Sequence, residues 1–356
     1  MADQRRRKRR RKKKGSPLGK VLLVLLILLL LAAGGGAWYV IHSLNKIQRV
    51  DTKQEVWIDP VMENFEADDP VESADPSAAE NPDAASQTDT LDPDSVDWAK
   101  PDSVIQNDHI HNILLIGQDR RPGEGRARSD TMIICSVNEE TGEIRLCSLM
   151  RDMYVPFPGG YSDNKINAAY TFGGMSLLDA LIEQDFGIPI EGNVEVDFDG
   201  FIQVMDLIAP LQIELSDVEA WYLNNGTGWQ LRTGLNAMTG EQLLRYARVR
   251  SIGHADYDRT ARQRKVLAAA FDKIRTLSVA RLSALADAAL PCITTDMTNA
   301  DIMRYVYMVG SNRMTIGATA RIPADNAHTS GMIRGMSVLV PDLAENSRIL
   351  KEFLYS

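Results

Sequence analysis

The sequence lacks the short motifs on which several common classes of enzyme depend. It contains no Gly-rich phosphate loop and no Rossmann fingerprint, so a nucleotide is not indicated as its ligand. It also contains no serine elbow and no Cys–His pair for covalent catalysis. No internal repeat is present. A function must therefore be sought in the distribution of charged and hydrophobic residues.

Cysteine is scarce, with three residues in a chain of 356. No C-x-x-C or Cys/His spacing is present, so zinc is not indicated either. Cys135 and Cys147 lie on two apolar segments joined by the turn-like Glu139–Gly142, and in a hairpin they could face each other. A disulfide is conceivable there, but two small buried thiols are the interpretation we favour. Cys292 has no evident partner.

Positive charge is concentrated at the start of the chain. Residues 1–20 have a net charge of +10, whereas the whole chain has −9. The next segment, Val21–Ile41, has 21 residues without a charge, and as a helix it would span roughly 31 Å, the hydrocarbon thickness of a bilayer. A cleaved signal peptide would have a shorter apolar region, so we favour an uncleaved anchor. The basic run then needs no nucleic-acid partner.

These features divide the chain into a basic cytoplasmic tail (1–20), one transmembrane helix (21–42), an acidic linker (43–108) and an extracytoplasmic globular domain (109–356). The positive-inside rule places the N-terminus in the cytoplasm and the bulk of the chain outside the cell membrane. The linker is rich in Asp, Glu, Pro, Ala and Ser, and it has few apolar residues. We therefore expect it to be disordered.

In the globular domain, predicted strands alternate with predicted helices. A buried strand is expected at Ile110–Gly117, and a hairpin at Thr131–Asn138 and Glu143–Leu149. A capping box, Thr239-Gly-Glu-Gln242, predicts a helix over Glu241–Arg248, and Asp258 is placed to cap a helix over Arg259–Thr276. Other expected helices are Ser176–Phe186, Gly200–Ile208, Asn299–Val309 and Asp342–Phe353, with strands at Val194–Phe198 and Met314–Ile322. The alternation predicts an α/β domain with helices on both faces of a sheet.

Two aspartates flank the turn between the first two strands. Asp119 follows the first strand, and Asp130 begins the next, so adjacent strands would bring both carboxylates to one edge of the sheet. Paired carboxylates suit Mg²⁺, which prefers few protein ligands and a phosphate oxygen. Salt bridges with neighbouring arginines are the alternative, and spacing alone slightly favours them.

Cationic side chains follow the hairpin and surround the start of the long helix. Arg151 ends the return strand and could donate two parallel hydrogen bonds to a phosphate, or it could pair with its neighbour Asp152. Lys165 adds a cation in a later loop. The densest cluster contains Arg245, Arg248, Arg250, Arg259, Arg262, Gln263 and Arg264, with Asp256 and Asp258 between them. We expect Arg259, Arg262 and Gln263 to share the N-terminal face of one helix, where an anion is favoured. Together these groups predict a pyrophosphate site.

The segments that carry these residues resemble the LytR–CpsA–Psr (LCP) family of cell-wall glycopolymer ligases. They are ILLIGQDRR (Ile113–Arg121), RSDTM (Arg128–Met132), SLMRDMYVPFPG (Ser148–Gly159), KINAAY (Lys165–Tyr170), RYARVR (Arg245–Arg250) and DYDRTARQRKVL (Asp256–Leu267). The resemblance implies a mixed central sheet between helical layers, with the lipid tail of the substrate in an apolar tunnel. It also implies a membrane-anchored enzyme that uses Mg²⁺.

The implied reaction moves an anionic glycopolymer, of the teichoic acid or capsular type, from undecaprenyl pyrophosphate to peptidoglycan and releases polyprenyl phosphate. The resemblance makes Asp119 and Asp130 the metal ligands, and Arg151, Asp256 and Arg259 the catalytic candidates. The expected pyrophosphate contacts are Arg151, Lys165, Arg248, Arg250, Arg259, Arg262 and Gln263. Two alternatives remain open: a lipid pyrophosphatase that uses the same site, and a membrane-anchored regulator or polyanion-binding protein without turnover.

Overall fold

The computed structural model describes residues 39–60, 89–96, 98–101, 103–118, 126–311 and 314–356. The chain forms two compact units, Met1–Lys46 and Ile47–Ser356. The second unit contains the central sheet. Most of the predicted transmembrane segment, residues 21–38, lies outside the described residues. Among the helices that are described, none combines the length and the apolar character needed to cross a membrane.

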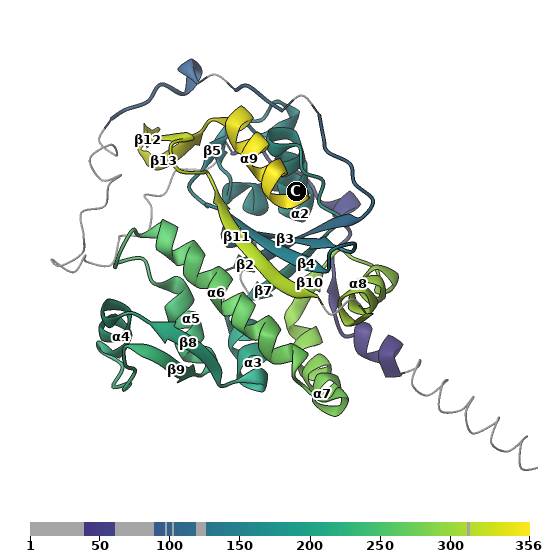
Figure 1. Ribbon diagram of the computed structural model, residues 1–356. Helices are drawn as coiled ribbons and strands as arrows, with labels where there is room; N and C mark the ends of the chain where they lie inside the picture. The colour runs from purple at the N-terminus through teal and green to yellow at the C-terminus, as the bar shows by residue number, and fades with distance from the viewer. Residues whose placement is uncertain (1–38, 61–88, 97, 102, 119–125, 312–313) are drawn as a thin grey trace, which may run out of the picture. The chain divides into compact units, whose positions relative to one another are not determined.

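A seven-stranded sheet forms the centre of the second unit (Figure 1). Its strands, in spatial order, are β1 (Gln48–Arg49), β10 (Ile293–Thr295), β7 (Gly192–Asp197), β2 (Ile110–Gln118), β3 (Ser129–Asn138), β4 (Glu143–Leu149) and β11 (Thr315–Ile322). β3 is antiparallel to both β2 and β4, whereas β2 pairs with β7, and β4 with β11, in parallel. The sheet is therefore mixed, as predicted.

Helices cover both faces of this sheet, which explains why its central strands are apolar on both sides. On one face lie α2 (Ala168–Phe186) and α9 (Leu343–Tyr355), whose Leu178 and Leu350 share a core cluster with Leu114 and Ile134. On the other lie α3 (Phe198–Ile208), α5 (Gly240–Arg248), α6 (Asp256–Arg275) and α8 (Asn299–Ser311). The predicted α/β arrangement is confirmed.

The predicted capping residues give one success and one error. Thr239 and Gln242 form the expected capping box at the start of α5. Asp258 does not cap α6, because the helix begins two residues earlier, at Asp256, and the residue before it is Ala255 with a φ of 46°. The carboxylate of Asp258 instead accepts a hydrogen bond from the backbone N–H of His254 at 2.8 Å.

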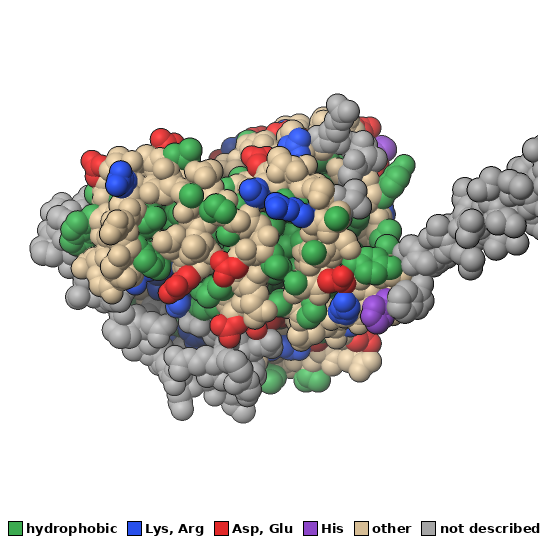
Figure 2. Space-filling view, turned by 90° about the horizontal axis from the view of Figure 1, so that it is seen from below, with side chains coloured by type: hydrophobic (Ala, Val, Ile, Leu, Met, Phe, Trp, Pro, Cys, Tyr) green, Lys and Arg blue, Asp and Glu red, His purple; other side chains and the backbone are tan. Residues whose placement is uncertain are grey.

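A small β-hairpin layer beyond α5 was not predicted from the sequence. β8 (Leu211–Leu215) pairs with β9 (Gly234–Met238), and α4 (Asp217–Asn224) lies between them in the chain. Leu211, Met238 and Leu243 share a core cluster there. α7 (Val279–Ala289) was also missed. Seen from the side of these elements, hydrophobic side chains are spread among polar ones (Figure 2).

Two short ladders complete the fold, and the strand register settles the positions of the cysteines. β5 (Tyr154–Val155) pairs with β6 (Asn164–Lys165), and β12 (His328–Ile333) with β13 (Met336–Pro341). Cys147 lies opposite Ile134, and Cys135 opposite Leu146, so the two thiols point to opposite faces of the sheet. Both are free, which confirms the interpretation as two thiols.

Residues 47–60, which belong to the predicted linker, contact the globular fold. The carboxylate of Glu55 accepts a hydrogen bond from the backbone N–H of Ser176 at 2.8 Å, beside a break in α2 at Gly174. It also pairs with Arg126 at 2.6 Å. The indole of Trp57 donates to the hydroxyl of Ser176 at 2.8 Å. This stretch is apolar and aromatic enough to pack, and residues 61–88 of the predicted linker lie outside the described part.

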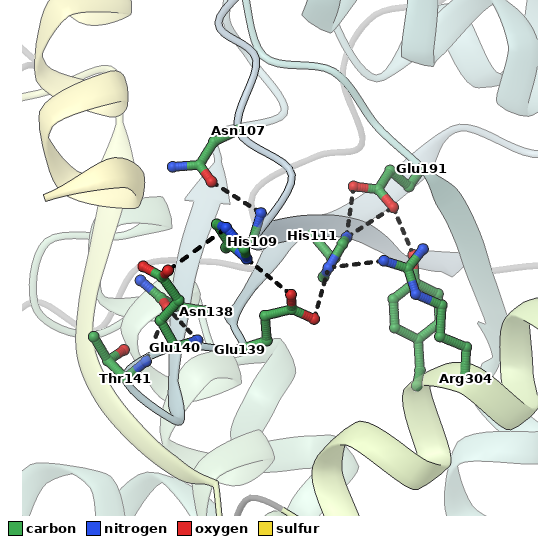
Figure 3. Close-up of polar contacts among 10 residues, drawn as sticks. Asn107, His109, His111, Asn138, Glu139, Glu140, Thr141, Glu191 and Arg304 are labelled. Atoms are coloured by element: carbon green, nitrogen blue, oxygen red, sulfur yellow. Dashed lines mark hydrogen bonds and ion pairs between the residues drawn. The ribbon is translucent and has the colours of Figure 1, made fainter.

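A polar cluster connects α8 to the N-terminal end of β2 (Figure 3). The guanidinium of Arg304 lies 3.1 Å from Nε2 of His111, and Nδ1 of the same ring lies 2.9 Å from Glu191. Tyr305 donates to the same glutamate at 2.9 Å. Among the described residues, no cluster of His, Cys, Asp and Glu is suited to hold a metal. The hydrogen bonds of the polar cluster join α8 to β2 and to Glu191, the residue before β7.

Asp185, on α2, gives a prediction about stability. Its side chain is buried, and burial raises its pKa to about 7. The folded chain then binds a proton that the unfolded chain releases near pH 4, so unfolding becomes easier as pH rises from about 4 to 7. Replacing Asp185 with Asn should stabilise the protein at pH 8 by about 4 kcal/mol and have little effect at pH 4. Urea unfolding at both pH values measures this, and an equal effect at both would contradict it.

Candidate active site

The candidate site lies at the edge of the sheet where β2 ends, β3 begins and β4 ends. Gln118 pairs with Ser129, so the end of β2 and the start of β3 meet at this edge. Asp130 lies here, and Arg151 follows the end of β4. Asp119, the other predicted metal ligand, lies outside the described residues.

Arg151 is the centre of the site. Its guanidinium donates to Asp130 at 2.6 Å, and its Nε lies 3.5 Å from Asp152 and 3.6 Å from Asp256. Burial acts to lower the pKa of Arg151, but the three carboxylates outweigh it and raise the pKa above its ordinary value. The side chain therefore stays cationic. Its Nε makes no hydrogen bond among the described residues, although it lies between the carboxylates of Asp152 and Asp256.

Lys165 and Asp152 form a buried ion pair next to Arg151. The short β5–β6 ladder holds Lys165, whose Nζ lies 2.9 Å from Oδ1 of Asp152. Lys165 is only 1% exposed, so the pair is shielded from solvent. Burial alone would raise the pKa of Asp152, but Lys165 and Arg151 outweigh it and hold the pKa well below its usual range. Asp152 is therefore an anion.

The first turn of α6 supplies the opposite side of the cluster. Asp256 accepts from Nε of Arg250 at 2.8 Å and from Arg259 at 3.2 Å. Burial raises the pKa of Asp256 despite these arginines, and it lowers the pKa of Arg259. Nε of Arg259 has no hydrogen-bond partner among the described residues. The cluster thus holds two buried guanidiniums with unused donors.

Five of the predicted site residues meet in this cluster, whereas Arg262 does not. Arg151, Lys165, Arg250, Asp256 and Arg259 come together, as predicted. Arg262 does not join them, although we placed it on the same helix face. Its guanidinium donates to Glu219 at 2.8 Å and to the carbonyl of Val249 at 3.1 Å, so it joins α6 to α4 and to the loop after α5.

Arg248 and Gln263 line an apolar pocket of about 230 Å³ beside the cluster. The pocket lies between the sheet and helices α3, α5 and α6, and the guanidinium of Arg248 stacks on Phe198 at 4.3 Å. Gln263 is one helical turn from Arg259, so α6 contributes to the polar cluster and to the pocket. The other lining residues include Ile116, Val194, Phe201, Val204, Leu244 and Val266. A ligand with a charged head and an apolar tail fits this arrangement.

Comparison with known proteins identifies the family. A model of the LytR_cpsA_psr family matches residues 69–352. The chain belongs to this LCP family. It is 32% identical over 189 residues to "Polyisoprenyl-teichoic acid--peptidoglycan teichoic acid transferase TagU" of Halalkalibacterium halodurans, which covers 52% of this chain and 60% of that protein. It is 29% identical over 270 residues to the TagU of Enterococcus faecalis, covering 73% and 84%. "Regulatory protein MsrR" of Staphylococcus aureus is 32% identical over 163 residues, covering 46% of this chain and 49% of that protein.

The chain thus spans about half to three fifths of the first curated relatives that it matches. Among solved structures, "LytR-CPS2A-psr family protein YwtF (TagT) with bound octaprenyl pyrophosphate lipid" has a TM-score of 0.54 at 22% identity, covering 73% of this chain and 100% of that one. The structure of gbs0355 from Streptococcus agalactiae has a TM-score of 0.58 at 22% identity, covering 69% and 88%. These similarities establish the LCP fold for this chain.

Two features of the site were not predicted from the sequence: the role of Asp152 and the pocket residues on α3. We treated Asp152 only as a neighbour that might neutralise Arg151, whereas it joins Lys165, Arg151 and Asp256 in one cluster. The adjacent pair Arg151-Asp152 was the available signal. The pocket residues on α3, such as Phe201 and Val204, were not predicted. An apolar helix face has the same sequence pattern whether it packs in a core or lines a cavity.

The described carboxylate fits a magnesium ion only in part. Asp130 offers a partly exposed side chain, with Oδ1 engaged by Arg151 and Oδ2 on the other side of the carboxylate. Mg²⁺ takes few protein ligands and keeps waters or phosphate oxygens, so one or two carboxylates suffice. The donor chemistry at Asp130 is therefore compatible with this ion.

Proposed function

We propose that this LCP protein transfers a glycopolymer from polyprenyl pyrophosphate to a hydroxyl of peptidoglycan and releases polyprenyl phosphate. The observation that carries the proposal is the position of the cationic cluster directly beside the apolar pocket, joined through α6. Pyrophosphate linked to a lipid is a ligand with both characters. The similarity to teichoic acid transferases and to a protein with bound octaprenyl pyrophosphate supports the same substrate class.

The residues of the cluster would act by binding and by stabilising charge. In the proposed reaction the oxygen of the acceptor hydroxyl forms a bond to the glycan-side phosphorus, and the bond from that phosphorus to the bridging oxygen breaks. The hydroxyl proton is released to solvent. Negative charge then develops on the polyprenyl phosphate. Arg151, Arg250 and Arg259 lie where their N–H groups can stabilise it, and their positions are fixed in advance by Asp130 and Asp256.

Magnesium and the membrane belong to the same proposal. Asp119 and Asp130 would hold Mg²⁺, which would neutralise charge on the phosphate oxygens. Residues 21–42 would anchor the chain in the cell membrane by a single span, with the catalytic domain outside the cytoplasm.

The test is a transfer assay with the full-length chain in detergent. A polyprenyl-pyrophosphate-linked glycan is supplied with Mg²⁺, with and without peptidoglycan, and both glycan products and released polyprenyl phosphate are measured. The proposal expects glycan attached to peptidoglycan, and release of lipid phosphate that depends on the acceptor. Release at the same rate without peptidoglycan would instead indicate a lipid pyrophosphatase. Binding without either product would indicate a regulator or polyanion-binding protein.

The pocket provides a second prediction. Val204 lines it from α3, and replacement with Trp should fill part of its volume. Displacing about three methylene-sized groups of the lipid costs about 2 kcal/mol, so kcat/KM should fall roughly 30-fold for a long-chain substrate. A substrate with a very short prenyl chain should be affected much less. Val218→Trp, at a half-exposed position on α4, is the matched control. Equal losses with both chain lengths would contradict a lipid pocket.

A further inference from the structure

One arginine is buried without a counter-ion. Among the described residues, the arginines that are less than a tenth exposed are Arg151, Arg259, Arg262 and Arg264. The first three each pair with a carboxylate. Arg264 has no ion pair in the described part of the chain. Its Nη1 donates to the hydroxyl of Ser148 at 2.7 Å, and its Nε is buried without a hydrogen-bond partner.

The surroundings of Arg264 favour an anion. Removing a guanidinium from water is costly unless a partner compensates its charge. A guanidinium has five N–H donors, and Arg264 uses one of them, toward Ser148. Burial lowers the pKa of Arg264, and the positive charge of Arg321 lowers it further. A negatively charged group at this place would be stabilised by both arginines.

Arg321 supplies the second cation. On β11 it lies opposite Ser148 of β4, so Arg264 and Arg321 meet at this serine from a helix and from a strand. The guanidinium carbon of Arg321 lies 4.1 Å from the centre of the Tyr257 ring. Tyr257 is seven residues before Arg264, so both lie on the face of α6 that packs against β4 and β11 (Figure 1). Arg321 and Tyr257 are partly exposed, and Asp325, the ion-pair partner of Arg321, is 82% exposed. The two arginines are therefore near solvent.

The two arginines lie beyond the reach of one pyrophosphate bound at the cationic cluster. Ser148 precedes Arg151 by three residues, which is roughly 10 Å along a strand. Arg264 follows Arg259 by five residues, which is roughly 7.5 Å along a helix. The two phosphorus atoms of a pyrophosphate share one oxygen, so they cannot occupy both places. A second anionic group is needed beside Arg264.

The position of Arg264 on α6 indicates which end of the substrate carries this group. Gln263 lines the apolar pocket, and Arg264, the next residue, projects about 100° further round the helix. The pocket side fits the lipid, so the side of Arg264 is left for the glycan. We propose that Arg264 and Arg321 bind a phosphodiester of the glycopolymer, next to the pyrophosphate. This inference rests on the proposed function, which gives the substrate an anionic glycan.

The experiment compares two short donors. Both carry a disaccharide on a short-chain prenyl pyrophosphate, and one also has a glycerol phosphodiester at the free end of the disaccharide. Calorimetric titration of the full-length chain in detergent gives the Kd of each donor. The wild type should bind the donor with the additional phosphate about tenfold more tightly, the effect of one hydrogen bond to a charged group. Equal Kd values for the two donors overturn the inference.

Variants assign this preference to Arg264. Arg264→Gln keeps a donor for Ser148 but removes the charge, so the ratio of the two Kd values should fall to about one. Arg321→Gln should lower the same ratio. Arg275→Gln, at an exposed position on the same helix, should keep the tenfold ratio. A tenfold ratio in Arg264→Gln overturns the inference.

Thermal unfolding separates a binding residue from a structural one. Removal of Arg264 leaves no carboxylate without a partner, so Arg264→Gln should unfold at the temperature of the wild type or above it. Arg262→Gln leaves Glu219 without its arginine and should unfold at a lower temperature. If Arg264→Gln unfolds at a temperature as low as that of Arg262→Gln, Arg264 is a structural residue and the inference fails.

Small anions make the test independent of the proposed function. Glycerophosphoglycerol, a soluble phosphodiester, should raise the unfolding temperature of the wild type but not that of Arg264→Gln. If neither donor binds the wild type, the proposed function fails, and this shift decides alone: its presence supports the anion site and its absence overturns it. If the donors show the tenfold ratio but no glycan is transferred, the proposed function fails and the site stands. A shift with inorganic phosphate but not with the diester assigns the site to free phosphate and overturns the inference.

Discussion

Replacing Arg151 with Ala is expected to lower the rate of glycan transfer by at least about 100-fold, the usual loss when one preorganised donor is removed from a developing negative charge. Arg151 is the group that three carboxylates hold in place, and its Nε has no hydrogen-bond partner among the described residues. The transfer assay with lipid-linked glycan measures kcat directly. We expect most of the loss in kcat, because the charge that Arg151 would stabilise develops during the reaction.

Two further variants show whether this effect belongs to the site. Arg275→Ala removes an arginine whose side chain is 39% exposed on the same helix as Arg259, and it should retain the rate of the wild type. Arg151→Lys keeps the charge but loses the planar fork, so it should recover only part of the activity. Far-UV circular dichroism checks that each variant folds. Activity of Arg151→Ala within a few-fold of the wild type would remove Arg151 from the proposed mechanism.

Replacing Lys165 with Met is expected to destabilise the folded chain by about 3–5 kcal/mol. Lys165 is almost fully buried, and its ammonium group neutralises Asp152 at 2.9 Å. Removing one partner of a buried ion pair leaves the other charge uncompensated, and this costs much more than the pair itself contributes. The free energy of unfolding in urea measures the effect at pH 7, where the anion of Asp152 is present.

The cost should depend on the charge that is left behind. The double variant Lys165→Met/Asp152→Asn removes both charges, so it should recover most of the lost stability. Lys53→Met, at an exposed position in the 3-10 helix Thr52–Gln54, should change stability by less than about 0.5 kcal/mol. Equal destabilisation in the single and double variants would mean that packing of the lysine stem, rather than its charge, is what matters.

The sequence contains enough local information to predict the central strands and the capped helices. β2, β3 and β4 are apolar runs bounded by turns, and Thr239 with Gln242 marks the start of α5. These signals depend only on residues that are close together in the sequence, so the elements that they predict are also present in the folded chain. The convergence of Arg151, Arg250 and Arg259 was also predicted, from the concentration of cations in an acidic chain and from the family motifs.

Features that depend on partners distant in the chain were not predictable. The position of Arg262 on α6 indicated a site residue, but Glu219, 43 residues earlier, holds it on another face. The start of α6 was predicted at Arg259, whereas the helix begins at Asp256. The residue before it, Ala255, adopts an unusual backbone conformation that no capping motif signals. The two cysteines could have faced each other in a hairpin, and only the register places them on opposite faces.

The contacts of residues 47–60 determine where a shortened fragment of the chain can begin. A fragment that starts at His109, where the globular pattern begins in the sequence, would leave the backbone N–H of Ser176 without Glu55 and the hydroxyl of Ser176 without Trp57. It would also remove β1 from the exposed edge of β10. A fragment for crystallisation should therefore begin no later than Ile47, where the second compact unit starts.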